Sequence, residues 1–164
     1  MFIRSYQPAD LPACKQLYTE LVQTHRELYH DEMIGAPDPS VGFVNQLQQR
    51  GHEAFWVAEE DGKVVGLIGL IIESEDGVIE PIVVAKTHRK QGIGTMLLKH
   101  VIDMAKTKGL RFLNIRPVAR NRNAIRCFHR AGFQTLGFIE VFMDLRGDFV
   151  AEEGLKIHDK LFDW

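Results

Sequence analysis

The residues with the clearest chemical potential form a glycine-rich turn, Arg89-Lys-Gln-Gly-Ile-Gly-Thr95, between a β-branched run and a long amphipathic stretch. This order predicts a strand followed by a helix, whose first amides lack intrahelical partners and attract anions. Gly92 and Gly94 let a ligand approach the backbone closely, because neither carries a Cβ. We therefore predict a phosphate site, although such a glycine pair also occurs where a helix simply packs closely on a sheet.

Two common nucleotide-binding motifs do not fit this turn. The dinucleotide-binding pattern GxGxxG needs a third glycine where this chain has Leu97, and a P-loop needs Gly-Lys followed by Ser or Thr. A pyrophosphate site of another type is the remaining interpretation.

A second informative block follows along the chain, from Asn121 to Phe133. Together the two blocks resemble the GNAT superfamily of N-acetyltransferases, whose members carry R/QxxGxG/A at the start of one helix and NxxAxxxY(x)3GF on the next. The match runs through Arg89, Gly92, Gly94, Asn121, Ala124, Gly132 and Phe133. The resemblance implies a single domain over residues 1–164, of α+β (mixed α/β) class. Its central, mostly antiparallel sheet would have about seven strands, flanking helices, and one parallel β-α-β pair splayed around the cofactor.

The cofactor that the resemblance implies is acetyl-CoA, bound as a cosubstrate without a metal. Its pyrophosphate is expected on five consecutive backbone amides, with Arg89 or Lys90 nearby. Those amides belong to Gln91, Gly92, Ile93, Gly94 and Thr95. Asn121 is expected either to hydrogen-bond the pantetheine arm or to cap the following helix. Arg120, Arg122, Arg126 and Arg130 form a basic cluster that would meet the 3′-phosphate or would only be solvated.

Pro81 interrupts the predicted strand before the turn, because proline cannot donate to a β-ladder. In GNAT domains a bulge and a splay occur at this strand. A shared splay would leave the backbone groups of Ile82, Val83 and Val84 free to pair with the pantetheine amides, as an added strand does. An ordinary edge strand is the alternative.

The implied reaction is direct attack of an amine on the thioester in a ternary complex. An alkyl amine with a pKa near ~10 is protonated at neutral pH, so a base is useful. We predict Glu80 as the catalytic base or amine ligand, and strand alternation places it on the same face as Ile82 and Val84. A structural pairing with an arginine is the alternative role for Glu80.

Phe128 departs from the family pattern, because many members have a tyrosine at this position that can protonate the leaving thiolate. His129 and Cys127 are the neighbouring candidates for that acid. We expect an enzyme that acetylates a primary amine of a small molecule or a peptide. The rival hypothesis, which Phe128 favours, is a noncatalytic acetyl-CoA-binding sensor or regulatory module.

Composition excludes several other classes. The chain has 164 residues, 45% of them hydrophobic, and its net charge of -2 offers no basic field for nucleic acid. Two cysteines without a metal or disulfide pattern suit a reduced cytoplasmic setting. The histidines show no HxxxH or HExxH spacing, so no metal is expected. No apolar run approaches ~18 residues and no signal peptide is apparent, so no membrane partner is expected.

Hydrophobic periodicity and turn residues predict the order of the elements. Strands are expected at 2–5, 54–59, 63–72, 78–85, 111–116, 133–145 and 155–164, and helices at 10–28, from Ser40 to near 51, from the glycine turn to Gly109, and at 123–131. The strand at 111–116 should run parallel to that at 78–85, because a helix crosses between them. Phe138, Val141 and Phe142 would pair with a second subunit in a homodimer or fill the core.

Overall fold

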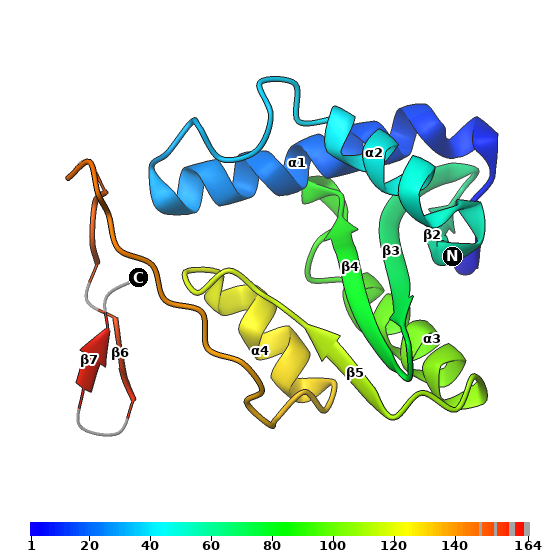
Figure 1. The fold of residues 1–164 in the computed structure, drawn as a ribbon. Helices are drawn as coiled ribbons and strands as arrows, with labels where there is room; N and C mark the ends of the chain where they lie inside the picture. The colour runs from blue at the N-terminus through cyan, green and yellow to red at the C-terminus, as the bar shows by residue number, and fades with distance from the viewer. Residues whose placement is uncertain (148, 153, 158–159, 163–164) are drawn as a thin grey trace.

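The structure is a computed structural model that describes residues 1–147, 149–152, 154–157 and 160–162. Strands and helices follow the predicted order as far as the last helix (Figure 1). The helices are α1 (Leu11–Tyr29), α2 (Val41–Arg50), α3 (Ile93–Thr107) and α4 (Arg122–Arg130), with short 3-10 turns η1 (Pro8–Asp10), η2 (His52–Ala54) and η3 (Lys86–His88). The strands are β1 (Phe2–Ser5), β2 (Phe55–Glu60), β3 (Lys63–Glu73), β4 (Asp76–Val84), β5 (Phe112–Ile115), β6 (Leu155–Ile157) and β7 (Lys160–Phe162).

Within this described part of the chain, five strands form one sheet in the order β1-β2-β3-β4-β5. The first four are antiparallel, and β5 runs parallel to β4 because α3 crosses between them. The predicted mixed α/β class and the parallel pair are confirmed. The central sheet is smaller than the expected seven strands, since among the described residues β6 and β7 pair only with each other.

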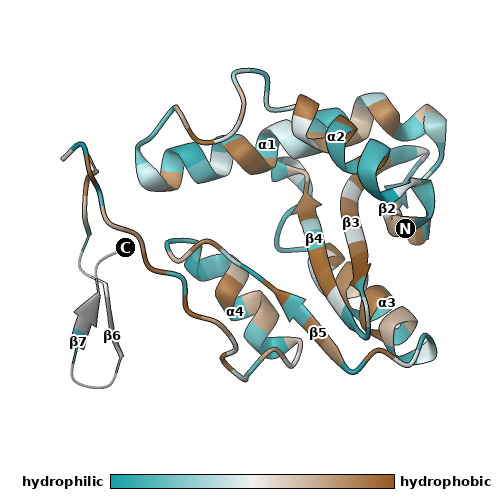
Figure 2. Ribbon diagram, viewed as in Figure 1, coloured by the Kyte–Doolittle hydropathy of each residue, from teal (hydrophilic) through white to brown (hydrophobic). Residues whose placement is uncertain are grey.

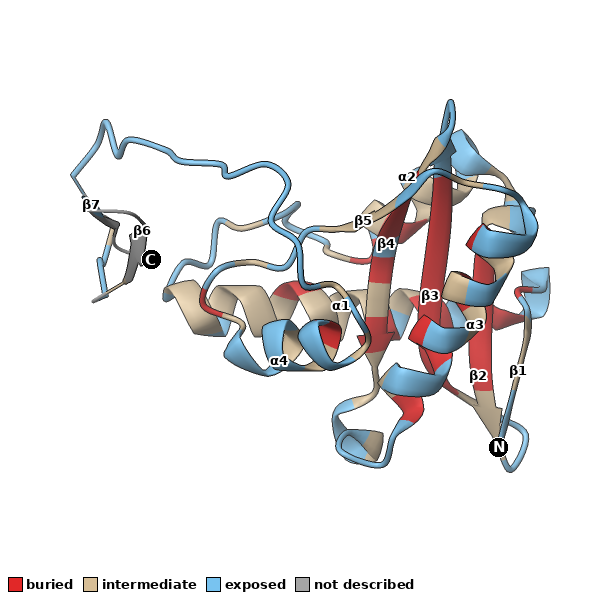
Figure 3. Cartoon of the chain, turned by 90° about the horizontal axis from the view of Figure 1, so that it is seen from below, coloured by how far each residue is buried: buried red, intermediate tan, exposed pale blue. Residues whose placement is uncertain are grey.

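Helices cover both faces of the sheet. On one face α3 buries Ile93, Leu97, Leu98 and Val101 against strand residues that include Ile68 and Ile79. On the other face α1 and α2 bury Cys14, Leu17 and Phe43 against Phe55, Leu67 and Val83. Because both faces are covered, β3 is buried along most of its length (Figure 3) and its sequence is continuously apolar rather than alternating.

A bulge interrupts the pairing of β3 with β4. Leu70 pairs with Ile79 and Ile68 pairs with Ile82, so Gly69 alone lies opposite Glu80 and Pro81, whose peptide bond is cis. A Cβ on Gly69 would lie 2.3 Å from the carbonyl oxygen of Glu80, which explains why glycine stands there. The extra residue in β4 breaks the side-chain alternation that a regular strand would have.

The predicted strand from Phe133 to Leu145 is wrong, because residues 134–147 contain no strand. Its aromatic and β-branched residues favour a strand, but a strand also needs a partner. Residues 134–143 make no backbone-to-backbone hydrogen bond with the described chain. The single strand predicted over 155–164 is instead the hairpin of β6 and β7 at the far end of this segment (Figure 1). Residues 158, 159, 163 and 164 of that prediction lie outside the described residues.

Candidate functional site

The turn between β4 and α3 presents a row of backbone amides. Lys90 and Gly92 have positive φ values of 64° and 87°, and Gly92 is the N-cap of α3. Left-handed residues at such a turn aim successive N–H groups into one concavity. The amides of Gln91 to Thr95 make no hydrogen bond with the chain that the structure describes. The five predicted pyrophosphate-binding residues therefore lie together at one helix N-terminus.

The two glycines of the turn are needed for different reasons. The positive φ at position 92 favours glycine there, whereas Gly94 lies in α3 with ordinary helical geometry. A Cβ on Gly94 would meet only ordinary contacts, 3.8 Å from Val84 Cγ2 and 4.0 Å from Cys127 Sγ. The protein itself therefore tolerates a side chain at Gly94, and the open space beside it suits a ligand that touches the backbone.

Arg89 fixes the turn to its surroundings. Its Nε donates to the carbonyl oxygen of Val84 at 3.0 Å, and Nη2 lies 3.4 Å from the Thr24 hydroxyl on α1. Arg89 thus ties the turn to the end of β4 and to α1, while Lys90 is exposed beside it.

The predicted splay between β4 and β5 is present. Pairing with β5 is limited to Asp76 through Ile79, and the last part of β4 has no neighbour on that side among the described residues. The Ala85 amide donates to Val65 in β3, so by antiparallel alternation the backbone groups of Val83 also face β3. Those of Ile82 and Val84 face the open edge. Of the three residues predicted to pair with pantetheine, only Ile82 and Val84 therefore direct their backbone groups to the open edge, whereas those of Val83 are directed at β3.

Glu80 lies on the opposite face of the sheet from the one predicted. Ile79, Ile82 and Val84 share the α3 face, whereas the bulge turns the exposed Glu80 toward the α1 and α2 face. There its Oε1 accepts a hydrogen bond of 3.1 Å from Gln46 Nε2 of α2. The prediction that Glu80 shares a face with Ile82 and Val84 is wrong because regular alternation fails at the bulge.

Two residues beside Glu80 were missed by the sequence analysis. The Oε1 atom of Gln46 is buried without a hydrogen-bond partner among the described residues. Burial raises the pKa of Tyr18 on α1, and the charge of Glu80 raises it further, so the phenol lies near that carboxylate. Gly42 on α2 makes room for the ring, because a Cβ there would lie 2.5 Å from it. In the sequence, Tyr18 follows Leu17 and Gln46 precedes Leu47, two apolar positions of amphipathic helices. This proximity is the one sequence signal that could have pointed to either residue.

The second motif block serves the fold more than the predicted site. Asn121 caps α4, since its Oδ1 accepts from the Ala124 amide at 3.0 Å, which is one of its two predicted roles. Phe128 is buried in the core on the α3 face and carries no proton to donate. Arg120 is also buried, with its guanidinium over the rings of Tyr29 and Phe149, so this arginine is occupied within the chain.

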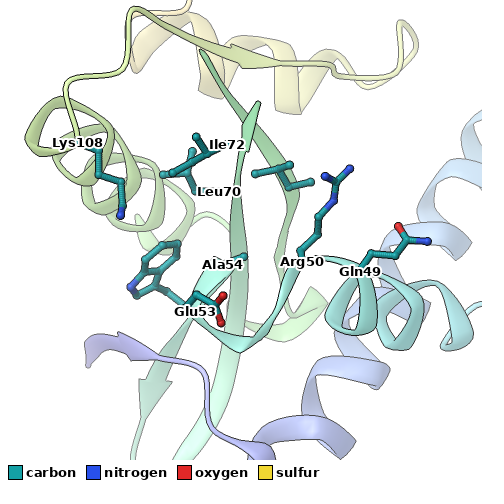
Figure 4. A pocket seen from close by; sticks show the side chains of 9 residues that line it. Gln49, Arg50, Glu53, Ala54, Leu70, Ile72 and Lys108 are labelled. Carbon is teal, nitrogen blue, oxygen red and sulfur yellow. The ribbon is translucent and has the colours of Figure 1, made fainter. Parts of the chain in front are cut away.

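A separate hollow of about 320 Å³ lies at the end of β3 remote from the glycine turn (Figure 4). Trp56 and Ile72 contribute apolar surface to it, and Arg50, Glu53 and Lys108 contribute charge. None of the predicted site residues lines this hollow.

Within the described ranges no group of three or more His, Cys, Asp or Glu side chains could hold a metal ion. No helix in those ranges combines the length and apolar character needed to cross a bilayer.

Comparison with known proteins finds N-acetyltransferases among the relatives of this chain. A probable N-acetyltransferase of Xenopus tropicalis, camello, is 37% identical over 83 residues, which cover 49% of this chain and 38% of camello. An uncharacterised N-acetyltransferase of Methanocaldococcus jannaschii is 28% identical over 139 residues, covering 80% of this chain and 60% of that protein. The chain thus spans between 38% and 60% of the length of these two curated relatives.

A solved structure agrees with these relatives. The crystal structure of the ribosomal-protein-alanine N-acetyltransferase from Brucella melitensis superposes with a TM-score of 0.66 at 25% identity, covering 80% of this chain and 83% of that one. The model of the acetyltransferase (GNAT) family matches residues 14–133, which include both motif blocks and the splayed strands. The chain therefore belongs to the acetyltransferase (GNAT) family.

Proposed function

We propose that this chain transfers an acetyl group from acetyl-CoA to a primary amine, with Glu80 as the base or amine ligand. The observation that carries the proposal is the position of the Glu80–Gln46 pair at the bulge where β4 separates from β5. The glycine turn follows from the end of the same strand. Strand β4 thereby connects Glu80, whose carboxylate suits an amine, with the glycine turn, whose backbone amides suit a pyrophosphate.

The residues at the turn and along β4 fit acetyl-CoA. The free amides of Gln91 through Thr95 suit the pyrophosphate, with Lys90 as an exposed cation beside them. The outward backbone groups of Ile82 and the outward amide of Val84 suit the pantetheine amides. Bound there, acetyl-CoA supplies an acetyl group activated as a thioester.

The exposed carboxylate of Glu80 suits a cationic amine. A primary ammonium group has three N–H donors, and the exposed carboxylate of Glu80 can accept from it while Gln46 Nε2 holds that carboxylate from α2. Glu80 would then take one proton, directly or through water, so that the nitrogen lone pair is free for direct attack.

The amine is proposed to belong to a small molecule or to a peptide. The Brucella melitensis relative is named for a ribosomal-protein alanine, which makes an N-terminal peptide amine a natural member of any test panel. An α-amino group has a pKa of about 8, compared with about 10 for an alkyl amine, so a base deprotonates it more easily. Phe128 offers no acid for the leaving thiolate, which is tolerable because thiols have pKa values of about 8.5.

The test is release of CoA thiol across a panel of small amines and alanine-starting peptides, with wild type, Glu80→Gln and Glu75→Gln. Glu75→Gln is the matched control, because it makes the same change on an exposed turn residue away from the site. We expect Glu80→Gln to lower turnover at neutral pH at least about 10-fold, with unchanged affinity for acetyl-CoA by calorimetry.

Two outcomes would count against the proposal. Equal rates for Glu80→Gln and wild type at every pH would remove Glu80 from the reaction. Binding of acetyl-CoA without turnover of any amine would favour the rival function, a noncatalytic acetyl-CoA-binding module.

A further inference from the structure

We propose that the hollow at the end of β3 binds a small zwitterion with an apolar body, which is the chemistry of a free apolar amino acid. This site is separate from those of the amine and of acetyl-CoA, because none of the residues proposed for either lines the hollow. The inference goes beyond the proposed reaction, since it concerns another ligand and depends on different residues.

The size of the hollow suits a molecule of about one amino acid. Its volume of about 320 Å³ lies at the lower end of the range of roughly 300–1,000 Å³ for small-molecule sites. A coenzyme such as acetyl-CoA is too large for this volume. The ligand is therefore small, and the side chains around it decide its chemistry.

The floor of the hollow is apolar and comes from two neighbouring strands. Leu70 and Ile72 lie on one face of β3, and Trp56 of β2 adds its indole ring. Figure 2 shows the hydrophobic colouring of β3 continuing to the end of the strand, where the chain turns into β4. His100 of α3 packs against the Trp56 ring in a T-shaped contact with the centroids 5.5 Å apart, so the floor is formed before a ligand binds. This floor suits an aliphatic or aromatic side chain.

Charged side chains of both signs surround this floor. Figure 4 shows Lys108 and Arg50 on opposite sides of it, with Glu53 below the space between them. Within the part of the chain that the structure describes, neither the Lys108 ammonium nor the Glu53 carboxylate has an ion pair or a side-chain hydrogen bond. Arg50 Nη2 lies 3.8 Å from Oε1 of Glu73, which is too far for a hydrogen bond, so the guanidinium can still donate to a ligand.

This set of charges favours a ligand that carries both signs. A carboxylate between Lys108 and Arg50 gains charge-assisted hydrogen bonds from two cations. A ligand with only a negative charge would meet repulsion from the unpaired Glu53, and a ligand with only a positive charge would meet repulsion from the two cations. In an amino acid, the ammonium group can pair with Glu53 while the carboxylate pairs with the basic side chains. Its side chain then lies on the apolar floor.

The backbone of β3 adds a hydrogen-bond donor to the hollow. The Phe55 carbonyl oxygen points toward β1, where it accepts from the Tyr6 amide at 3.0 Å. Trp56 therefore faces its partner Ile68, and by alternation Ile72 directs its N–H and C=O to the same side. The ladder with β2 stops at Phe55, so within the described chain no strand lies beside Ile72 there. The unpaired N–H of such an edge can donate to the carboxylate of the ligand.

The first experiment is calorimetric titration of the full chain with L-phenylalanine, L-leucine and L-tryptophan, in the absence of acetyl-CoA so that no acetyl transfer occurs. The amino acid that binds most tightly is then compared with its amide, which lacks the carboxylate, with its N-acetyl derivative, which lacks the ammonium group, and with glycine, which lacks the apolar body. We expect each of these three compounds to bind at least about 10-fold more weakly. No binding of any of the three amino acids at millimolar concentrations, or equal binding of all the analogues, would overturn the proposal.

The second experiment places the ligand in the hollow. Glu53→Gln and Lys108→Gln are compared with Glu75→Gln and Lys106→Gln, which make the same changes at exposed residues outside it. We expect each variant of the hollow to weaken binding of the amino acid at least about 10-fold, and each control to bind as wild type does. All four residues are exposed, so melting temperatures should show that every variant stays folded.

The analogues and the variants together give the sharpest result. We expect Glu53→Gln to leave the weak affinity for the N-acetyl derivative unchanged, because that compound has no ammonium group to pair with Glu53. Lys108→Gln should likewise leave the affinity for the amide unchanged. Glu80→Gln distinguishes the hollow from the proposed amine site. Affinity for the amino acid that is lost in Glu80→Gln and kept in Glu53→Gln would place the ligand at the amine site and overturn the inference, while leaving the proposed function intact.

Discussion

The Nε2 atom of Gln46 donates to Oε1 of Glu80 over 3.1 Å, and this bond joins α2 to the bulge in β4. It also fixes the orientation of the Gln46 amide, since the flipped amide would direct its oxygen at the carboxylate. The buried Oε1 of Gln46 is therefore an acceptor without a donor in the described chain. Because this oxygen is buried, it cannot reach a ligand, and the role left to Gln46 is to hold the Glu80 carboxylate at the bulge.

Gln46→Leu tests this role. We expect KM for the amine to rise about 10-fold, because the Glu80 carboxylate loses the hydrogen bond that positions it, which is worth about 1.4 kcal/mol. Affinity for acetyl-CoA should not change, since the glycine turn is untouched. Gln49→Leu, on an exposed position of the same helix, is the matched control. Equal KM values for both variants would show that Gln46 only supports the fold.

Gly94→Val tests whether a ligand needs the space beside Gly94, since the family motif accepts only glycine or alanine at this position. A Cβ here meets only ordinary contacts, at 3.8 Å and 4.0 Å, and valine is no worse a helix former than glycine. We therefore expect the melting temperature to change little. Calorimetry should nevertheless show at least about 10-fold weaker binding of acetyl-CoA, because the branched side chain occupies the approach to the amides. Wild-type affinity in a stable Gly94→Val protein would argue against a pyrophosphate at this turn.

The two cysteines should differ sharply toward iodoacetamide. Cys14 is fully buried, and burial raises its pKa to about 12, so it holds almost no thiolate at neutral pH. Cys127 is only partly buried, and its Sγ lies 4.0 Å from the position of a Cβ on Gly94. We expect peptide mass spectrometry of the native protein to find alkylation at Cys127 alone, slowed by saturating acetyl-CoA. Labelling of Cys14 at a similar rate, or no protection of Cys127, would contradict this arrangement.

The sequence predicted most of the fold where local signals and tertiary packing agree. The helix from Asp10 to about Leu28 is observed as α1, and the hairpin at Asp61-Gly62 joins β2 and β3 as expected. The glycine turn could be found because positive φ and free amides depend on local residue types. In each case the pattern of apolar residues and the turn chemistry lead to the same structure.

Three features could not be read from local pattern. The face of Glu80 depends on a bulge opposite Gly69, a register shift that involves two strands. The Gln46 contact joins residues that are 34 positions apart, and Tyr18 approaches Glu80 from a different helix. Residues 134–147 include many strand-forming residues, but the described chain gives them no ladder partner, and a strand needs one.

Asp10 should make the stability of the domain depend on pH in acid. Its carboxylate accepts from Arg4 Nη1 and Nη2 at 2.7 Å and 2.8 Å and from the Gln7 amide at 2.8 Å, which joins β1 to the start of α1. The hydrogen bonds from Arg4 and then Gln7 outweigh burial and lower the pKa of Asp10 below its ordinary 3.8. The ionised form is thus favoured by folding. Its stabilisation is complete above the unfolded pKa of 3.8 and is lost as pH falls from there through the lower folded value.

Asp10→Asn should therefore lower the free energy of unfolding by about 1.5–3 kcal/mol at pH 7, the range for hydrogen bonds to charged groups. Urea denaturation at a series of pH values should show this difference shrinking as the pH falls below 3.8, because wild-type Asp10 then becomes protonated as well. Asp103→Asn, on an exposed position of α3, is the control and should change stability by less than about 0.5 kcal/mol. A difference between Asp10→Asn and wild type that stayed constant into strong acid would mean that Asp10 acts through packing rather than through its charge.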